Sequence, residues 1–175
     1  MKQNVPLKND QPSLVLTSMT FKDGAHIPLE YACNGENISP ELSWVLNPSQ
    51  KIGSYILIVD DPDGQRAEGK KFVHWVAIFS GDMTSVPQGS SGMLNSLDND
   101  AIELSNHSGK TTYQGPCPTI GDGKHVYRFT LFATTQPIKE INAHSFRAPC
   151  TAEECREQLF GKIIAEALLT GIYAR

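Results

Sequence analysis

The run FVHWVAIF, from Phe72 to Phe79, contains seven apolar residues and one histidine. Side chains of a strand alternate between its two faces. The alternation puts one apolar set on each face, namely Phe72, His74, Val76 and Ile78 on the first and Val73, Trp75, Ala77 and Phe79 on the second. A strand that is apolar on both faces is covered on both, so the run predicts a central strand of a sandwich or a barrel.

His74 is the ionisable residue inside this run. A buried imidazole without a hydrogen-bond partner costs about 1–3 kcal/mol, so the fold has to supply one. A backbone carbonyl or a bound water would be sufficient, which would make His74 an ordinary core residue. Alternatively, His74 is one wall of a binding site whose other walls come from elsewhere in the chain.

Other segments have the composition and alternation of strands. Ser54 to Asp60 (SYILIVD) and His125 to Thr135 (HVYRFTLFATT) are the strongest, and Leu14 to Ser18 and Ala101 to Leu104 are shorter candidates. The polar stretch between Ser80 and Lys110 is long enough to be a functional loop or to contain short strands. The first three quarters of the chain are therefore predicted to be β-structure.

The periodicity changes near the end of the chain. Thr151-Ala-Glu-Glu154 has the form of a capping box, which predicts a helix that begins after Thr151. The apolar residues that follow have helical spacing: Leu159, Phe160, Ile163, Ile164, Ala167 and Leu168. Gly171 is placed to end such a helix. The sequence predicts a C-terminal α-helix from about Thr151 to Thr170, which closes a mainly β single domain.

Length and charge exclude several classes of protein. A chain of 175 residues is one domain of ordinary size, and residues 14–175 are assigned to it, with 1–13 as a flexible N-terminal segment. The net charge of −4 and the lack of a basic block exclude a nucleic-acid-binding role. No apolar run reaches the ~18–20 residues of a membrane span. The first residues, MKQNVPLKNDQPS, lack the apolar region of a signal peptide, so a cytoplasmic location is expected, with export left open.

The four cysteines are Cys33, Cys117, Cys150 and Cys155. Their spacings match no zinc motif, and a metal site that combines Cys33 and Cys117 with histidines is disfavoured, so no metal and no cofactor are expected. A bridge between Cys150 and Cys155 is conceivable, but nothing supports it. We expect structural thiols, because a free cysteine behaves as a small buried hydrophobe.

Polar residues at strand ends are candidates for a binding site. Asp61 ends its strand and is held in extended geometry by Pro62, while His125 and Tyr127 share one face of a later strand. The loop 113–124 before them is rich in glycine and proline, which let a backbone approach a ligand and fix a turn around it. Two histidines, a tyrosine and a carboxylate suit a small oxyanion and equally suit general acid–base catalysis.

The motifs that carry these residues resemble those of the phosphatidylethanolamine-binding protein family. DPD at 61–63, VHW at 73–75, GPCP at 115–118 and H-x-Y at 125–127 have that family's order and spacing. NGENISPELSW (34–44), VPQGSSG (86–92) and the ending LLTGIYAR resemble its bacterial, Raf-kinase-inhibitor-like branch. The resemblance covers residues 14–175 and implies an antiparallel β-sandwich of two sheets with a small anion pocket at one end.

The resemblance also implies which residues form that pocket. Its anion- or ligand-binding positions fall on Asp61, Asp63, His74, Gly115, His125 and Tyr127. Three departures affect the rim. Gly64-Gln65 replaces the alanine and proline of the family's DPDAP turn, Thr119 replaces a second proline, and Val126 replaces an arginine and should face away from the pocket.

The resemblance favours a binding protein without catalysis, for phosphate, a phospholipid headgroup or a phosphorylated side chain. The alternative is a hydrolase that uses the His/Asp/Tyr cluster, although no G-x-S-x-G, H-E-x-x-H or P-loop motif is present. A third possibility is regulation or inhibition of a kinase or a protease through an exposed loop. The expected partners are a small phosphate-bearing ligand, a kinase or protease, and a second copy of the chain in a homodimer.

Overall fold

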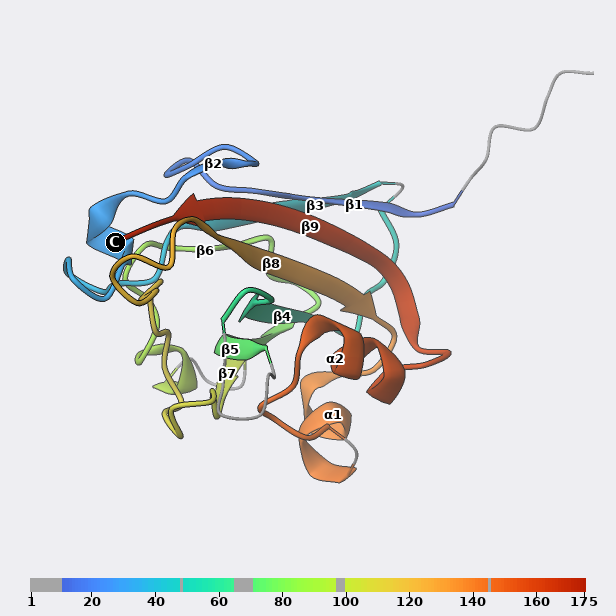
Figure 1. The fold of residues 1–175 in the computed structure, drawn as a ribbon. Helices are drawn as coiled ribbons and strands as arrows, with labels where there is room; N and C mark the ends of the chain where they lie inside the picture. Colours follow the sequence, from blue (N-terminus) through green and yellow to red (C-terminus); the bar gives the residue numbers. More distant parts are fainter. Residues whose placement is uncertain (1–10, 48, 65–70, 97–99, 145) are drawn as a thin grey trace, which may run out of the picture.

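Two β-sheets pack face to face in the computed structural model, which describes residues 11–47, 49–64, 71–96, 100–144 and 146–175 (Figure 1). The smaller sheet has the order β1-β3-β6 and the larger has the order β2-β9-β8-β4-β5-β7. The strands are β1 (Ser13–Thr17), β2 (Ala25–His26), β3 (Leu42–Asn47), β4 (Ser54–Asp61), β5 (Phe72–Ser80), β6 (Ser85–Val86), β7 (Ala101–Leu104), β8 (His125–Thr134) and β9 (Ile163–Tyr173). The α-helices are α1 (Ile138–His144) and α2 (Ala152–Gln158), and short 3-10 turns are η1 (Leu29–Tyr31) and η2 (Leu94–Ser96).

The mainly β-sandwich predicted from the sequence is confirmed, with small differences. The pairings are antiparallel except for β2, whose two residues pair parallel to β9. Helix α1 was not anticipated. Of the segment 1–13 that was expected to be flexible, residues 1–10 lie outside the described part, and β1 begins at Ser13. In the described ranges, no helix is long and apolar enough to cross a membrane.

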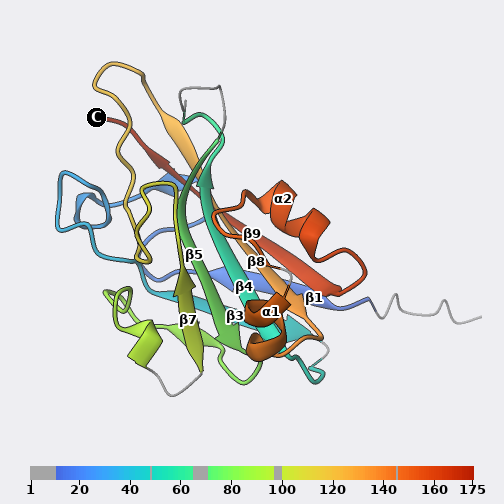
Figure 2. The ribbon, with the colours of Figure 1, turned by 90° about the horizontal axis from the view of Figure 1, so that it is seen from below.

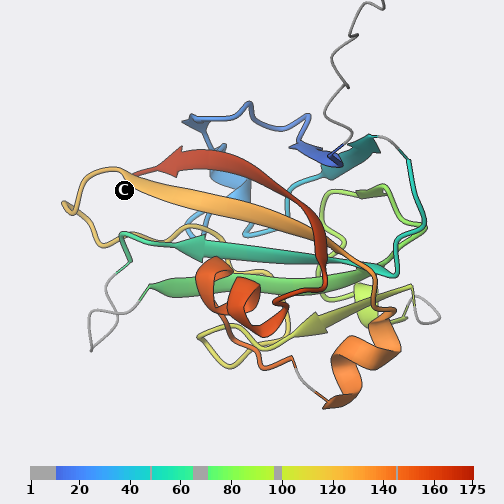
Figure 3. The same cartoon turned by 90° about the vertical axis from the view of Figure 1, so that its right-hand side faces the viewer.

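The larger sheet is covered on both faces, as the apolar strands require. One core lies between the two sheets and includes Trp44 of β3 with Leu57 of β4 and Phe129 of β8. The second core lies under the helices and includes Ile56 and Cys155. Figures 2 and 3 show α1 and α2 together on the face of the larger sheet that β1 and β3 leave free. Strand β4 is buried along its whole length because it lies between these two cores.

The face of β5 predicted for His74 is wrong, because the strand contains a β-bulge at this residue. Val59 pairs with Trp75, but the next residue of β4, Asp60, pairs with Val73, so His74 is an extra residue in its strand. Such an extra residue shifts the alternation on one side of it. Val73 consequently joins Val76 in the core under the helices, whereas strict alternation had put them on opposite faces. His74 turns to the other face.

The C-terminal helix is much shorter than the sequence predicted. The capping box at Thr151 is present, and α2 begins there, but it ends at Gln158. Gly161 has a φ of 75°, a left-handed conformation that ends helices, and the segment predicted to be helical up to Thr170 forms β9 instead. This strand pairs with β8 along its length, and its alternate residues Ala165, Ala167 and Leu169 are buried, so tertiary pairing outweighs the helical stripe.

A charged network fastens α2 to the larger sheet. Asp60, which is fully buried, accepts two hydrogen bonds of 2.7 Å from Arg128 of β8 and one of 3.0 Å from the backbone N–H of Ala152. The same guanidinium donates to Glu153, also within the first turn of α2, and holds the pKa of that carboxyl at about 2. The network therefore neutralises a carboxylate that is out of reach of water.

We expect Arg128→Met to lower the free energy of unfolding by about 3–5 kcal/mol, because it leaves the buried Asp60 carboxylate unpaired. Arg156→Met is the matched control, since it breaks the exposed pair with Glu166 and should cost at most about 1 kcal/mol. Urea unfolding of both variants measures the two losses. Equal losses would contradict a special role for the buried network.

Candidate functional site

A cavity of about 150 Å³ opens at the end of the sandwich where β4 ends and β8 begins. Its walls come from three separated stretches of sequence, residues 61–64, 72–74 and 114–127. They meet because the bulged end of β5 and the loop before β8 lie beside β4. The lining residues are Asp61, Gly64, Phe72, His74, Gln114, Cys117, Pro118, Thr119, Asp122, His125 and Tyr127. Four of the predicted site residues, Asp61, His74, His125 and Tyr127, are therefore brought together.

Asp61 is fixed by the turn that follows β4. Its Oδ1 accepts the backbone N–H groups of Asp63 and Gly64, each at 2.8 Å, which is the pattern of an aspartate that caps its own turn. Its Oδ2 accepts the Nδ1–H of His125 at 2.8 Å. The carboxylate thus sets the orientation of the His125 ring and holds the hydrogen on Nδ1. In the neutral ring, Nε2 is then the nitrogen without a hydrogen.

His74 is anchored by a backbone carbonyl, which is the kind of partner expected if it were an ordinary core residue. Its Nδ1 lies 2.8 Å from the carbonyl oxygen of Gln114, and a carbonyl only accepts, so Nδ1 carries the hydrogen. A neutral ring then has a bare Nε2. Burial lowers the pKa of His74, and the Gln114 carbonyl and the Asp61 charge oppose that shift without reversing it.

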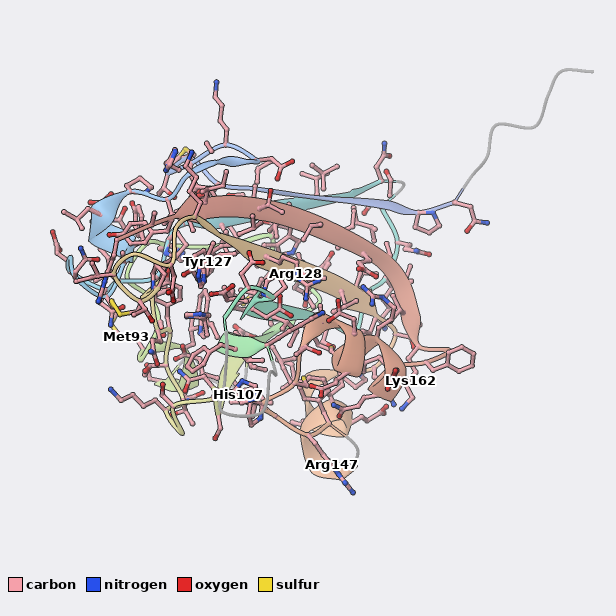
Figure 4. The ribbon with its side chains drawn as sticks, viewed as in Figure 1. Met93, His107, Tyr127, Arg128, Arg147 and Lys162 are labelled. Carbon is pink, nitrogen blue, oxygen red and sulfur yellow. A yellow bond between two sulfur atoms is a disulfide. The ribbon has the colours of Figure 1, made fainter. Side chains whose placement is uncertain are left out.

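Tyr127 stands between the two histidines. Its ring lies 5.2 Å from that of His74, edge to face, and 6.4 Å from that of His125, stacked. Figure 4 labels it next to Arg128, its neighbour on β8, whose side chain belongs to the opposite face of the sheet. Among the described residues, its buried hydroxyl has no hydrogen-bond partner of normal geometry. Burial, and after it the nearby Asp61 charge, raise the pKa of Tyr127, so the phenol keeps its proton.

Two predicted site residues do not line the cavity. The backbone N–H of Gly115 is donated to the Asn37 side chain at 2.7 Å, and a Cβ at Gly115 would lie 2.1 Å from the carbonyl oxygen of Tyr31. Close packing therefore explains this glycine. Asp63 accepts the backbone N–H of Val126 at 3.0 Å and so ties the turn after β4 to the start of β8. Both residues support the walls from behind.

Only two of the four residues that depart from the family pattern are found at the cavity. Gly64 and Thr119 line the cavity, whereas Gln65 lies outside the described residues. Val126 is 38% exposed and does not line the cavity, as the alternation of β8 predicted. The rim also contains Asp122, for which the sequence predicted no role in the site.

The expectation of four free thiols is wrong for two of them. Cys33 and Cys117 form a disulfide, and Cys117 is part of the cavity wall. Cys150 and Cys155 are free and buried, so the conceivable bridge between them is not formed. The even number of cysteines was the available signal, but the sequence separation of 84 between Cys33 and Cys117 gave no local cue. In the described part of the chain, no cluster of three or more His, Cys, Asp or Glu could hold a metal ion.

Comparison with known proteins identifies the family. The sequence model described as phosphatidylethanolamine-binding protein matches residues 17–174. A UPF0098 protein of Methanothermobacter thermautotrophicus is 35% identical over 166 residues, which are 91% of this chain and 98% of that protein. A UPF0098 protein of Mycobacterium tuberculosis is 41% identical over 119 residues, which are 68% of this chain and 53% of that protein. The chain thus spans about half the length of its mycobacterial relatives.

A solved structure agrees with the sequence comparisons. The phosphatidylethanolamine-binding protein homologue CT736 of Chlamydia trachomatis is 30% identical and superposes with a TM-score of 0.72 over 95% of this chain and 99% of its own. The motifs, the two-sheet fold and the matched range of residues lead to one conclusion. The chain belongs to the phosphatidylethanolamine-binding protein family.

Proposed function

We propose that the cavity binds the phosphate group of a small ligand, without catalysing a reaction. One observation carries this proposal, namely the buried Tyr127 hydroxyl, which lines the cavity with two imidazoles. Among the described residues it makes no hydrogen bond of normal geometry, although the Asp61 carboxylate and the backbone of Cys117 lie near it. A buried donor without a partner costs about 1–3 kcal/mol, and an anion oxygen would remove that cost. The Nε2 atoms of His74 and His125 can donate to the anion only when these rings are protonated, because each Nδ1–H is already donated to another group.

The charges around the cavity are compatible with an anion. The Asp61 carboxylate already accepts three N–H groups, including that of His125, so much of its charge is compensated. Asp122 is exposed at the rim, where water screens it. A phosphate that also carries an ammonium group, as in ethanolamine phosphate, could place that group near Asp122.

The hydrolase alternative rests on the Asp61–His125 pair, which is arranged like the base and its orienting carboxylate in many hydrolases. The lining hydroxyls belong to Thr119 and Tyr127, and the raised pKa of Tyr127 makes its phenol a poor nucleophile. Incubation with a panel of phosphoesters and peptides separates the two functions, because turnover by the purified protein would contradict binding alone. Regulation of a kinase or a protease, the bacterial branch of the family and homodimer formation stay predictions.

The disulfide bears on where this binding takes place. Disulfides persist in oxidising compartments and are rare in the cytosol. The Cys33–Cys117 bond therefore supports a location outside the reducing cytoplasm, in place of the cytoplasmic location expected from the first residues.

We expect Tyr127→Phe to weaken the binding of inorganic phosphate about 10- to 100-fold, because it removes one hydrogen bond to a charged group. Tyr55→Phe is the matched control, since Tyr55 is also buried but lies near the opposite end of β4 from Asp61. Isothermal titration calorimetry measures both affinities. If the two variants bind phosphate equally well, the Tyr127 hydroxyl is not a ligand contact.

The affinity for sulfate should fall as the pH rises, by up to about tenfold per pH unit for each proton taken up. Sulfate stays fully ionised near neutral pH, so the titration reports on the protein. With its Nδ1–H committed to Gln114, His74 must gain a proton on Nε2 before it can donate to the anion. Calorimetry in two buffers of different ionisation enthalpy counts that proton. His74→Gln should flatten the pH dependence, His26→Gln should not, and a level profile in the unaltered protein would contradict the idea.

Low pH should favour anion binding through His74, but in the ligand-free protein it should lower the free energy of unfolding through the same residue. Because burial lowers the pKa of His74, the unfolded chain binds this proton at a higher pH than the folded chain does. The free energy of unfolding is therefore expected to decrease as the pH falls below about 6.5, by at most about 1.4 kcal/mol per pH unit. Urea unfolding between about pH 8 and about pH 5 measures this slope. The slope should be smaller in His74→Gln, and an unchanged slope would assign it to other groups.

A further inference from the structure

The disulfide in the cavity wall is accessible to solvent. Cys117 lines the cavity and is exposed, and Cys33 is partly exposed. A dissolved thiol can therefore reach the bond. Disulfides in exposed positions are the ones that are commonly labile or regulatory, whereas buried structural disulfides resist reduction.

The bond also holds the part of the loop that faces the ligand. The start of this loop is attached to the segment 33–37 by two hydrogen bonds, from Gly115 to the Asn37 side chain and from the backbone of Cys33 to the carbonyl of Pro116. The disulfide extends this attachment to Cys117, and the next two residues, Pro118 and Thr119, are the wall itself. Opening the bond would release the wall while Gln114 still holds His74.

A cation lies directly against the two sulfur atoms. Nη1 of Arg175 is 3.2 Å from Sγ of Cys117 and 3.6 Å from Sγ of Cys33. The C-terminus lies beside the loop that precedes β8 in all three ribbon views (Figures 1–3). A neighbouring guanidinium stabilises a thiolate, so it favours the departure of either sulfur when the bond is attacked.

We propose that the Cys33–Cys117 disulfide is a site of reversible reduction by a dithiol and that its redox state sets the affinity of the cavity for anions. The second half of this statement rests on the proposed binding function. The oxidised protein holds the wall in place and binds tightly, and the reduced protein binds weakly.

The chemistry is thiol–disulfide exchange. A thiolate of the dithiol attacks the sulfur of Cys117, which is the more exposed residue of the two. It forms a mixed disulfide with Cys117 and releases Cys33 as a thiolate beside Arg175. The second thiol of the reagent then attacks its own sulfur in the mixed disulfide and releases Cys117. The protein gains two electrons and two protons in total, and the dithiol loses them and becomes a cyclic disulfide.

The test compares phosphate binding before and after reduction with dithiothreitol under anaerobic conditions. We expect reduction to weaken phosphate binding at least about fivefold, a coupling of ordinary size, and reoxidation to restore it. Cys33→Ala should bind like the reduced protein and should not respond to dithiothreitol. A variant with Cys150→Ala and Cys155→Ala is the matched control, since these buried thiols lie in the other core and should leave the response intact.

Arg175 provides an independent readout, because it does not line the cavity. Arg175→Gln should slow the reduction of the bond several-fold while it changes the phosphate affinity of the oxidised protein by less than about twofold, and Arg175→Lys should retain most of the rate. Labelling of the released thiols over time measures the rate. An unchanged rate in Arg175→Gln would overturn the assigned role of the cation.

Equal phosphate affinities of the oxidised and reduced proteins would overturn the proposal. So would a reduced protein whose circular dichroism spectrum is that of an unfolded chain, because the loss of binding would then be global. If neither state binds phosphate, the proposed function fails, and hydrogen exchange of residues 115–124 decides the redox proposal. Faster exchange there after reduction would support a released wall, and unchanged exchange would overturn it.

Discussion

The extra residue in β5 decides which side of the central sheet receives His74. In a regular pairing with β4, His74 would lie opposite Asp60 and point toward the helices. The bulge removes it from the ladder, pairs Asp60 with Val73, and turns the imidazole to the face where Tyr127 lies. The backbone N–H of Gln114 donates to the carbonyl of His74, so the loop before β8 supplies the hydrogen bond that the bulged residue lacks in the ladder. The cavity therefore exists because the ladder is interrupted at this point.

Two consecutive carboxylates at the end of β4 point to opposite faces of the larger sheet. Asp60 pairs with Arg128 and holds α2, whereas Asp61 accepts from His125 and shapes the cavity. Strand β8 contributes to both, since Arg128 follows Tyr127. Each charge is buried together with its partner, which is the condition under which buried charges are tolerated. Structural support and ligand contact thus alternate residue by residue along the same two strands.

Most of the fold could be predicted from the sequence because its central strands are continuous apolar runs. Apolar runs such as Ser54–Asp60 mark the central strands, and both the two-sheet architecture and the family are confirmed. The C-terminal prediction failed for a physical reason. The apolar residues after Gly161 fit both the spacing of a helix and the alternation of a strand, and pairing with the open edge of β8 is what selects the strand. Long-range pairing of this kind is not encoded in a local window.

The site was predictable as a set of residues more than as a set of contacts. Four of the six residues named by the resemblance line one cavity, whereas Gly115 and Asp63 lie behind its walls. Contact of any of the six with a ligand stays a prediction. Strict alternation misplaced Val73, because a bulge leaves no mark in the composition of a strand. The disulfide was missed because its partners meet only after the chain has folded.

The position of β9 also has a consequence for how the chain is made. This last strand lies inside the larger sheet, between β2 near the N-terminal end and β8. During synthesis, β8 therefore leaves the ribosome with one edge open, and both cores stay incomplete until residues 163–173 follow. An open edge between apolar faces is a surface on which nascent chains associate. Within the larger sheet, β9 is the last of the described strands to be translated, and it closes the edge at which aggregation would otherwise begin.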